Sequence, residues 1–278
     1  MCALGNESKA VRTLFDTTHA SASIPSNDLN AYAFGSMGGH NAVATGLPPG
    51  EIGTSAAADF AVNMKRSDIR LGDVVVSTPR CASVGVLPYD RIKNLDGGAP
   101  QINGYLHPPP RALRSVLHDL ESDPNLGKTP LAVYTRDIAE SDEEFAHPGA
   151  ENDILYMSDY PHPQGKDTCS VCNPARVKAW PSRDSTQLCV HYGLIASGNQ
   201  VLKNALARDE LGRKHGILCF EMEAAGVMNI LSSLVIRGIR DDCDSNKNKV
   251  WQKYAAATAA AFAKLLSRVR PEVEAAQL

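Results

Sequence analysis

Apolar runs with the length of strands alternate with amphipathic runs with the length of helices through the second half of the chain. The predicted strands are LCVHYGLIASG (188–198), GILCF (216–220) and LVIRGI (234–239). The predicted helices are 199–216, EMEAAGVMNILSS (221–233) and 250–269. Alternating strands and helices form right-handed βαβ units around a largely parallel sheet. The pattern therefore predicts an α/β fold.

The first half of the chain shows the same two kinds of run, with more turn residues between them. Strands are predicted for the end of CAL (2–4), for the two arms of a hairpin with a Gly-rich turn (31–47), and for DIRLGDVVVS (68–77). Helices are predicted for AVRTLFDTTH (10–19), from about Gly53 to 64, and for 109–122. Residues 79–110 are rich in Gly and Pro and are predicted to be mostly loop.

Length and composition indicate one domain. The 278 residues are 43% hydrophobic and 21% charged, which is enough for one sizeable core. Residues 123–187 are polar and Pro-rich, and such a long excursion is usually an insertion or a lid. We therefore predict a single domain over 1–270, with a loop-rich insertion at about 123–187 and a tail at 271–278.

Charge and hydropathy narrow the range of partners. The formal net charge is −3 and no stretch is strongly basic, so neither nucleic acid nor an anionic membrane is an expected partner. No apolar run reaches the length of a membrane span. The first residues, MCALGNESKAV, lack the features of a signal peptide. Together with seven scattered cysteines, this predicts a cytoplasmic protein with reduced thiols.

One cysteine pair has the spacing of metal ligands. Cys169 and Cys172 form a CxxC, and His162 is near in sequence. A structural zinc site needs four ligands and a lone CxxC supplies two, so a surface loop with two thiols is the simpler interpretation. A zinc protein built on this motif stays an alternative, and neither a metal site nor a cofactor is predicted.

Polar clusters follow four of the predicted strands. They are Asn6 and Glu7; Ser197, Gly198 and Asn199; Glu221 and Glu223; and Asp241, Asp242 and Asp244. Ligands of open α/β sheets bind beyond the carboxyl ends of the strands, so these clusters are candidates for one site. Polar loops also begin at strand ends in the absence of a ligand, and an acidic turn such as DDCD can be merely solvated or bind a cation.

Several of these segments resemble the purine and uridine phosphorylase superfamily, which includes methylthioadenosine and AMP nucleosidases, and most closely its fungal members. The resemblance is carried by LPPGEIGTSAA (47–57), DIRLGDVVVS (68–77), HYGLIASGNQV (191–201), CFEMEAAGVMN (219–229) and 235–264. It implies a three-layer αβα sandwich with a mixed, largely parallel sheet. It also implies cleavage of the N-glycosidic bond of a purine nucleoside or nucleotide, with or without phosphate, in a homo-oligomer.

The resemblance also assigns roles to individual residues. Glu223 would accept hydrogen bonds from the ribose hydroxyls, Arg237 would orient it, and Met222 would pack on the sugar. Asp241 would protonate the leaving base and Glu7 would activate water. Residues expected beside the substrate, chiefly the purine, are Ser197, Val201, Leu202 and Phe220, although ordinary helix core is a strong alternative for Val201 and Leu202. A helix-start role is the simpler interpretation of Glu221.

Two departures from the family pattern bear on function. A central strand with a Gly-rich turn is expected just before Asp68 and is absent from the sequence, so either neighbouring strands close up or the chain folds poorly. Arg240 precedes Asp241, and a cation there favours the ionised carboxylate. These departures favour hydrolysis over phosphorolysis. They leave two alternatives, a non-catalytic nucleoside-binding or signalling domain and an inactive, truncated member of the family.

Overall fold

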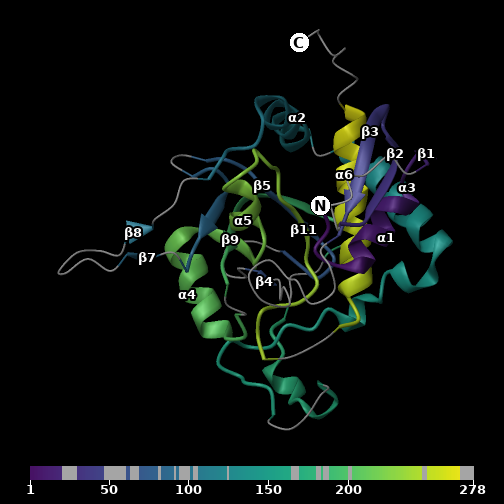
Figure 1. Ribbon diagram of the computed structural model, residues 1–278. Coiled ribbons are helices and arrows are strands. Elements are labelled where there is room, and N and C mark those ends of the chain that lie inside the picture. The colour runs from purple at the N-terminus through teal and green to yellow at the C-terminus, as the bar shows by residue number, and fades with distance from the viewer. Residues whose placement is uncertain are drawn as a thin grey trace.

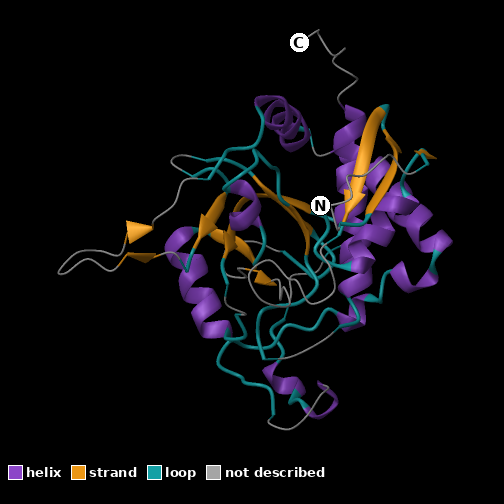
Figure 2. Ribbon diagram, in the orientation of Figure 1, coloured by secondary structure: helices purple, strands orange, loops and turns teal. Residues whose placement is uncertain are grey.

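The structure is a computed structural model (Figures 1 and 2). It describes residues 1–20, 30–46, 61–62, 69–80, 83–90, 92–93, 101–102, 106–123, 125–163, 169–179, 183, 188–199, 202–245 and 249–269, with backbone alone at 61–62, 92–93 and 101–102. The predicted tail and Val201 lie outside the described residues.

The largest sheet in the described part of the chain has six strands in the order β11-β5-β9-β10-β4, with β6 also paired to β9. The strands are β4 (Ala61–Val62), β5 (Val74–Ser77), β6 (Val86–Pro88), β9 (Val190–Ser197), β10 (Ile217–Glu221) and β11 (Ile236–Gly238). Strands β5, β6 and β10 run parallel to β9, whereas β11 and β4 are antiparallel to their neighbours. The predicted mixed, largely parallel sheet is confirmed.

The sheet closes up where a central strand was expected. Strand β5 pairs with β9 along one edge, from Val74 opposite Val190 to Ser77 opposite Gly193. Along its other edge it pairs with β11, with Val76 opposite Ile236. Both edges of β5 therefore have hydrogen-bonding partners, as buried backbone groups require. The strands that the structure describes beside β5 therefore leave neither of its edges unpaired.

Helices pack on both faces of the sheet, which confirms the three-layer sandwich (Figures 1 and 2). Val74 and Val76 share a buried cluster with apolar residues from helices on one side, whereas Val75 shares another with Met228. Neighbouring residues of a strand point to opposite faces. The helices are α1 (Gly5–Thr13), α2 (Arg111–Ser122), α3 (Asn125–Ser141), α4 (Ala205–His215), α5 (Ala224–Met228) and α6 (Gln252–Val269).

A separate small sheet carries the predicted hairpin. It consists of β1 (Thr17–Thr18), β2 (Tyr32–Met37) and β3 (His40–Thr45). Gly38 and Gly39 form the turn with positive φ angles of 61° and 84°, a conformation that glycine adopts without steric cost. Cys2, in the predicted first strand end, forms a single parallel bridge with Gly46 beside this hairpin. Two further short strands pair with each other, β7 (Ile92–Lys93) and β8 (Gln101–Ile102).

Several predictions from the sequence need correction. The helix predicted over 10–19 is found at Gly5–Thr13 instead, and Thr17–Thr18 forms strand β1. Ala61–Val62 forms strand β4 at the sheet edge, although the pattern predicted the end of a helix. Strand β6 lies within a region predicted to be mostly loop, and α3 begins the predicted loop-rich insertion. Helix α3 buries Leu131, Tyr134 and Ile138 among others. These side chains form a narrow apolar stripe, which the sequence pattern does not reveal because most other residues of the helix are polar. Elsewhere the region 123–187 contains short 3₁₀ turns, η1 (Glu143–Phe145), η2 (Ala150–Asn152), η3 (Cys169–Val171) and η4 (Pro174–Arg176).

Gly238 allows helix α6 to lie directly against β11. A Cβ atom at position 238 would lie 1.9 Å from the backbone oxygen of Ala255, which is far inside van der Waals contact. The absence of a side chain therefore sets the distance between helix and strand. Since Arg237 is the residue before Gly238 in the strand, the same close approach fixes where its side chain starts.

The buried carboxylate of Asp73 ties the start of β5 to the segment before β9. Asp73 is 2% exposed and accepts hydrogen bonds from both terminal nitrogens of Arg183, at 3.0 and 2.8 Å. It also bonds His191 Nε2 at 3.0 Å and the backbone N–H of Cys189 at 3.1 Å. Burial opposes ionisation, but the hydrogen bonds from His191 and Arg183 outweigh it and hold the pKa of Asp73 below its ordinary value.

We expect Asp73→Asn to destabilise the fold by about 3 kcal/mol at pH 7, because it removes the buried anion that pairs with the partly buried Arg183. The folded-state pKa of Asp73 is depressed, so its stabilisation is present above the unfolded pKa of about 3.9 and is lost as the pH falls. Denaturant unfolding at pH 7 and pH 3 measures this. The loss should shrink at pH 3, and the exposed Asp119→Asn variant is the control; equal stability of both variants at pH 7 contradicts the assignment.

Candidate functional site

The paired acids Glu221 and Glu223 lie where β10 ends and α5 begins. Glu221 is 1% exposed, and its Oε2 accepts hydrogen bonds from the backbone N–H groups of Glu223 and Ala224, both at 2.9 Å. Those N–H groups belong to the start of the helix and have no partner within it. The helix-start interpretation of Glu221 is therefore confirmed.

Glu223 is buried in a different way. Its side chain is 6% exposed, and neither carboxylate oxygen accepts a hydrogen bond from the part of the chain that the structure describes. The guanidinium of Arg237 approaches it, with Nη2 at 3.4 Å from Oε2. Burial raises the pKa of Glu223, and the negative charges of Glu221 and Glu7 add to the effect while Arg237 opposes it. A buried carboxylate with two open acceptor atoms is suited to a ligand that carries hydroxyl groups.

Ser197 supports the same junction from the end of β9. It is fully buried, and its Oγ accepts a hydrogen bond at 2.9 Å from the N–H of Ala225. The N–H of Gly198 donates to the backbone oxygen of Glu221 at 3.1 Å. The structure thus gives Ser197 a backbone partner in α5, and its predicted contact with substrate stays a prediction.

Two neighbouring cavities meet at Arg237. The first, of about 390 Å³, is lined by Glu223, Glu221 and Arg237 together with apolar side chains. The second, of about 260 Å³, is lined by Glu7, Arg237 and Arg240. Met1, Leu234, Ile236 and Ala263 also line both cavities. Glu223 and Glu7, which are far apart in sequence, therefore line two neighbouring cavities that share Arg237.

Glu7 is held by the backbone at the start of α1. Its Oε2 accepts hydrogen bonds from the N–H groups of Ala3 at 2.7 Å and of Leu4 at 3.3 Å. These contacts fix the carboxylate in the first turn of the helix, where negative charge is favourable. The structure places Glu7 at the cavity wall, as the site hypothesis requires, and its role with water stays a prediction.

Two of the residues predicted beside the substrate, Phe220 and Leu202, belong to an apolar cluster or pack against it. Phe220 is 2% exposed and contacts Tyr89 edge-to-face with ring centroids 5.6 Å apart. Cys243 is buried in the same cluster, and Leu202 packs against it from outside. Met222, between the two glutamates, is also buried. Phe220 and Leu202 thus have the packing of core residues, the alternative already open for Leu202.

Asp241 lies in the loop that follows β11, and it lines neither of the two cavities. Its Oδ1 accepts a hydrogen bond at 3.1 Å from the N–H of Cys243, and Arg240 Nε lies 3.4 Å from its Oδ2. The loop turns at Cys243, which has a φ of 44°. The cation that the sequence placed beside Asp241 is therefore in ion-pair contact with it.

The next residue, Asp242, is the buried acid of this loop. It is 6% exposed, and burial together with the negative charge of Asp244 raises its pKa well above the ordinary value. The nearby Arg208 opposes the shift; it is 1% exposed and donates to the backbone oxygen of Asp242. Sequence analysis placed Asp242 in the acidic cluster but gave it no role, and nothing in the pattern of α4 singled out Arg208.

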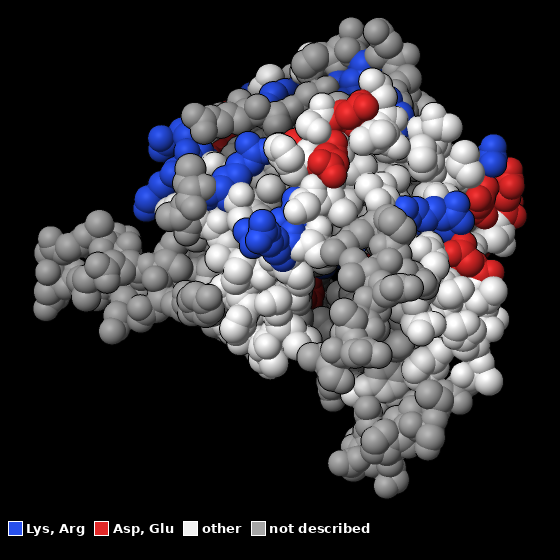
Figure 3. All heavy atoms as spheres, turned by 90° about the horizontal axis from the view of Figure 1, so that it is seen from above, with Lys and Arg blue, Asp and Glu red and all other residues white. Residues whose placement is uncertain are grey.

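Charged side chains on the outside of the molecule do not form a binding surface of one sign on the face seen in Figure 3. Among the residues coloured there, small basic and acidic groups are separated by uncharged surface. None of the described helices is long and apolar enough to cross a membrane. Three potential metal ligands, His162, Cys169 and Cys172, converge outside the cavities described above.

Solved structures with the same architecture come from enzymes that act on nucleosides. A 5′-methylthioadenosine/S-adenosylhomocysteine nucleosidase from Borrelia burgdorferi, solved with adenine, superposes with a TM-score of 0.55 at 13% identity over 97% of this chain and 98% of its own. The chain has the fold of the purine nucleosidases. Futalosine hydrolase of Helicobacter pylori has a TM-score of 0.55 at 14% identity, covering 95% of this chain and 94% of its own. A Neisseria meningitidis nucleosidase has a TM-score of 0.53 at 16% identity, covering 96% of each.

At the level of sequence, the nucleosidase-fold chain is similar to part of a much larger protein. It is 38% identical over 289 residues to a nucleotide-binding leucine-rich repeat (NLR)-like protein of the fungus Hyaloscypha variabilis. The alignment covers 96% of this chain and 28% of that relative, so the chain spans just over a quarter of its length. No protein-family model matches the sequence.

We expect Asp242→Asn to raise the melting temperature at pH 8 and to change it less at pH 5. The folded-state pKa of Asp242 is raised, so its contribution to stability is present below the unfolded pKa of about 3.9 and is lost as the pH rises toward the folded value. A neutral amide removes that loss. Thermal unfolding at both pH values, with the exposed Asp137→Asn as control, measures the effect; a variant less stable than the natural chain at pH 8 would show that Asp242 is ionised and paired.

Proposed function

We propose that the chain cleaves the N-glycosidic bond of a purine nucleoside or nucleotide by hydrolysis, giving free base and ribose or ribose phosphate. The observation that carries the proposal is the buried Glu223 carboxylate, which lines a cavity together with Arg237 and accepts no hydrogen bond from the described residues on either oxygen. Leaving such a group unsatisfied costs free energy unless a ligand supplies the missing donors. The shared fold supports the proposal, because similar structures contain adenine or 5′-methylthioadenosine.

In the proposed complex, Glu223 binds the ribose. Its two oxygens accept hydrogen bonds from the vicinal 2′- and 3′-hydroxyls, a geometry that one carboxylate can satisfy. Arg237, 3.4 Å away, keeps the carboxylate ionised and oriented. A bound sugar that donates to Glu223 offsets the burial that raises its pKa, so substrate binding and ionisation support each other.

The acidic loop after β11 supplies the proton for the leaving base. As the glycosidic bond breaks, negative charge accumulates on the purine and the sugar gains oxocarbenium character. A carboxylic acid that protonates N7 stabilises that charge. By its family position Asp241 is the proposed acid, whereas the neighbouring Asp242 has the raised pKa that suits a proton donor near neutral pH.

Glu7 is the proposed activator of the attacking water. Its Oε2 is occupied by backbone N–H groups, which leaves Oε1 for water. Glu7 lines the smaller cavity on the other side of Arg237 from Glu223, so water held there lies near the sugar. The sequence lacks the Gly-rich turn that would provide a phosphate nest, which favours water over phosphate as the nucleophile.

A nucleoside-binding domain without turnover is the second candidate. The contact between Arg240 and Asp241 favours it, because a cation beside a carboxylate stabilises the ionised form and weakens a general acid. The relative is an NLR-like protein more than three times as long as the aligned region, and a domain of such a protein can serve by sensing a ligand. This candidate binds the ribose through Glu223 in the same way.

The first prediction for this function concerns the acid. Purified protein should release free base from adenosine, inosine, methylthioadenosine or AMP without phosphate, measured by chromatography. Asp241→Asn should lower kcat by about 10²- to 10⁴-fold, the usual contribution of a general acid. Asp137→Asn on exposed α3 is the matched control. Retained activity in Asp241→Asn, with loss in Asp242→Asn, would transfer the role to Asp242; thermal stabilisation by a nucleoside without base release would favour the binding domain.

The second prediction concerns the ribose. Glu223→Gln should weaken turnover of a ribonucleoside by at least about tenfold, because each lost hydrogen bond to a charged group costs about 1.5–3 kcal/mol. It should affect the 2′-deoxynucleoside less, since that substrate never made one of the two bonds. The exposed Glu140→Gln serves as control. Equal losses on both substrates would remove Glu223 from contact with the 2′-hydroxyl.

A further inference from the structure

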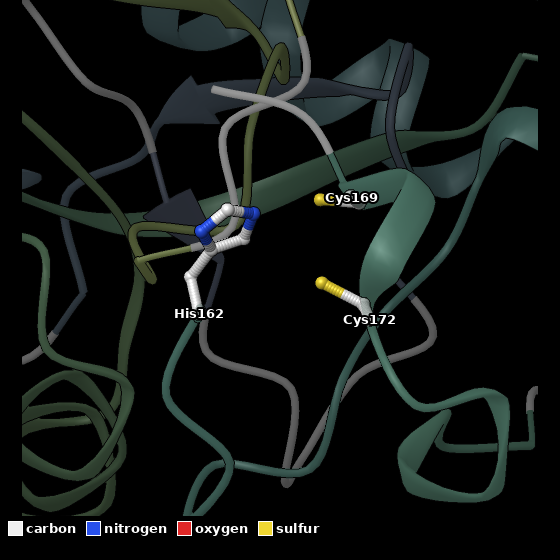
Figure 4. A group of neighbouring side chains, drawn as sticks. All are labelled: His162, Cys169 and Cys172. Atoms are coloured by element: carbon white, nitrogen blue, oxygen red, sulfur yellow. The ribbon is translucent and has the colours of Figure 1, made fainter. Parts of the chain in front are cut away.

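Three side chains with soft metal-ligand atoms converge at one end of the region between α3 and β9. One ligand atom each from His162, Cys169 and Cys172 lies within 4.8 Å of the other two (Figure 4). The imidazole and the two thiols point toward one another across a common space in that view. All three residues are partly buried, and neither cysteine forms a disulfide. The sequence offered the CxxC with His162 nearby as an incomplete site, and the fold brings the histidine within 4.8 Å of both thiols.

The spacing suits a small tetrahedral ion. Zinc binds cysteine sulfur at about 2.3 Å and histidine nitrogen at about 2.0–2.1 Å, which places tetrahedral ligand atoms about 3.6–3.8 Å apart. The three atoms here lie within 4.8 Å of one another. Side-chain rotations that shorten the distances between the ligand atoms by about 1 Å bring them to that geometry. Two thiolates and an imidazole are a ligand set that selects zinc over the harder magnesium and calcium ions.

The histidine ring has the tautomer that metal binding needs. His162 Nδ1 lies 3.1 Å from the backbone oxygen of Pro163. A carbonyl oxygen can only accept, so Nδ1 carries the hydrogen and donates it. The lone pair is therefore on Nε2, which becomes the ligand atom. A hydrogen bond from the second ring nitrogen to a carbonyl is the usual companion of a zinc-bound histidine.

Backbone pairing holds the two ends of this region together. Tyr156 and Val177 form an antiparallel bridge, and the N–H of Lys178 donates to Leu155 at 2.7 Å. The N–H of Asn173 donates to the Tyr160 hydroxyl at 2.9 Å. Because these bonds lie on both flanks of the ligands, the cluster is positioned before any metal arrives. Such a site costs less chain entropy to fill than one on an open loop.

The cluster is also connected to the acidic loop of the candidate active site. The backbone N–H of His162 donates to the Ser245 hydroxyl at 2.7 Å, and Ser245 ends the described part of the loop that begins at Arg240. Ser158 hydrogen-bonds Asp209, which pairs with Arg208, the residue that donates to Asp242. An ion that fixes His162 therefore restrains the loop that carries the proposed proton donor.

We propose that His162, Cys169 and Cys172 bind one structural zinc ion, which links the described residues 155–163 to 169–178 and, through His162 and Ser245, restrains the acidic loop of the candidate site. On binding, each thiol releases one proton and the imidazole stays neutral. The fourth position of the tetrahedron is taken by water or by a further side chain. No step of the proposed glycosidic cleavage runs through the ion.

The test begins with the metal content of the full chain. Protein prepared in reducing buffer with zinc, then dialysed, should contain about one zinc per chain by mass spectrometry of the metal. The double substitution Cys169→Ser and Cys172→Ser should lower this to background, whereas Cys189→Ser, a partly buried cysteine outside the cluster, should leave it unchanged. Zinc that persists in the double variant, or natural protein that never retains zinc, overturns the proposal.

Spectroscopy on the natural chain keeps the test independent of whether a variant folds. X-ray absorption at the zinc edge should show two sulfur ligands at about 2.3 Å and two nitrogen or oxygen ligands at about 2.0–2.1 Å. A chelator should lower the melting temperature, and added zinc should restore it. A sphere of nitrogen and oxygen alone, or a Cys169–Cys172 disulfide in the metal-free protein that zinc does not prevent, contradicts the proposal. Base release plays no part in these measurements, so they stand or fall separately from the glycosidase activity.

Discussion

The structure around the candidate site depends on the ion pair between the buried carboxylate of Glu223 and Arg237. Glu223 stands at the start of α5 with Arg237 as its charged neighbour, 3.4 Å away, and no hydrogen-bond donor from the described residues on either oxygen. A buried ion without such donors is costly. Glu221 and Ser197 use their side chains to bind the first N–H groups of the helix, so Glu223 is left free for a ligand.

The position of Arg237 depends in turn on how the sheet is assembled. Strand β11 runs antiparallel to β5, in the place left by the absent central strand, and pairs with it from Ile236 to Gly238. Gly238 allows α6 to come within contact of the strand. Arg237 thereby lines both the cavity that contains Glu223 and the cavity that contains Glu7. The sheet thus keeps Arg237 beside Glu223, the residue that we propose for ribose binding.

The two neighbouring aspartates of the acidic loop have different environments, which the sequence alone does not reveal. Asp241 is paired with Arg240, whereas Asp242 is buried and its pKa is raised. Arg208 of α4 holds the backbone of the loop from one side and His162 holds it from the other. Two neighbouring carboxyl groups in different environments can serve as anion and acid at the same pH, which makes their comparison informative for either candidate function.

The sequence by itself determined the α/β class, the main strands β5, β9, β10 and β11, and helices α2, α4 and α6, because local periodicity records which face of each element is buried. It also placed Glu223 and Asp241 at strand ends. Only the tertiary structure decided that β5 pairs directly with β11, that Phe220 packs on Tyr89, and that α3 is a helix. It alone brought His162 to the CxxC and Arg208 to Asp242. The contacts of β5 with β11, of Phe220 with Tyr89 and of Arg208 with Asp242 join residues distant in sequence, and periodicity within one segment carries no information about its partner.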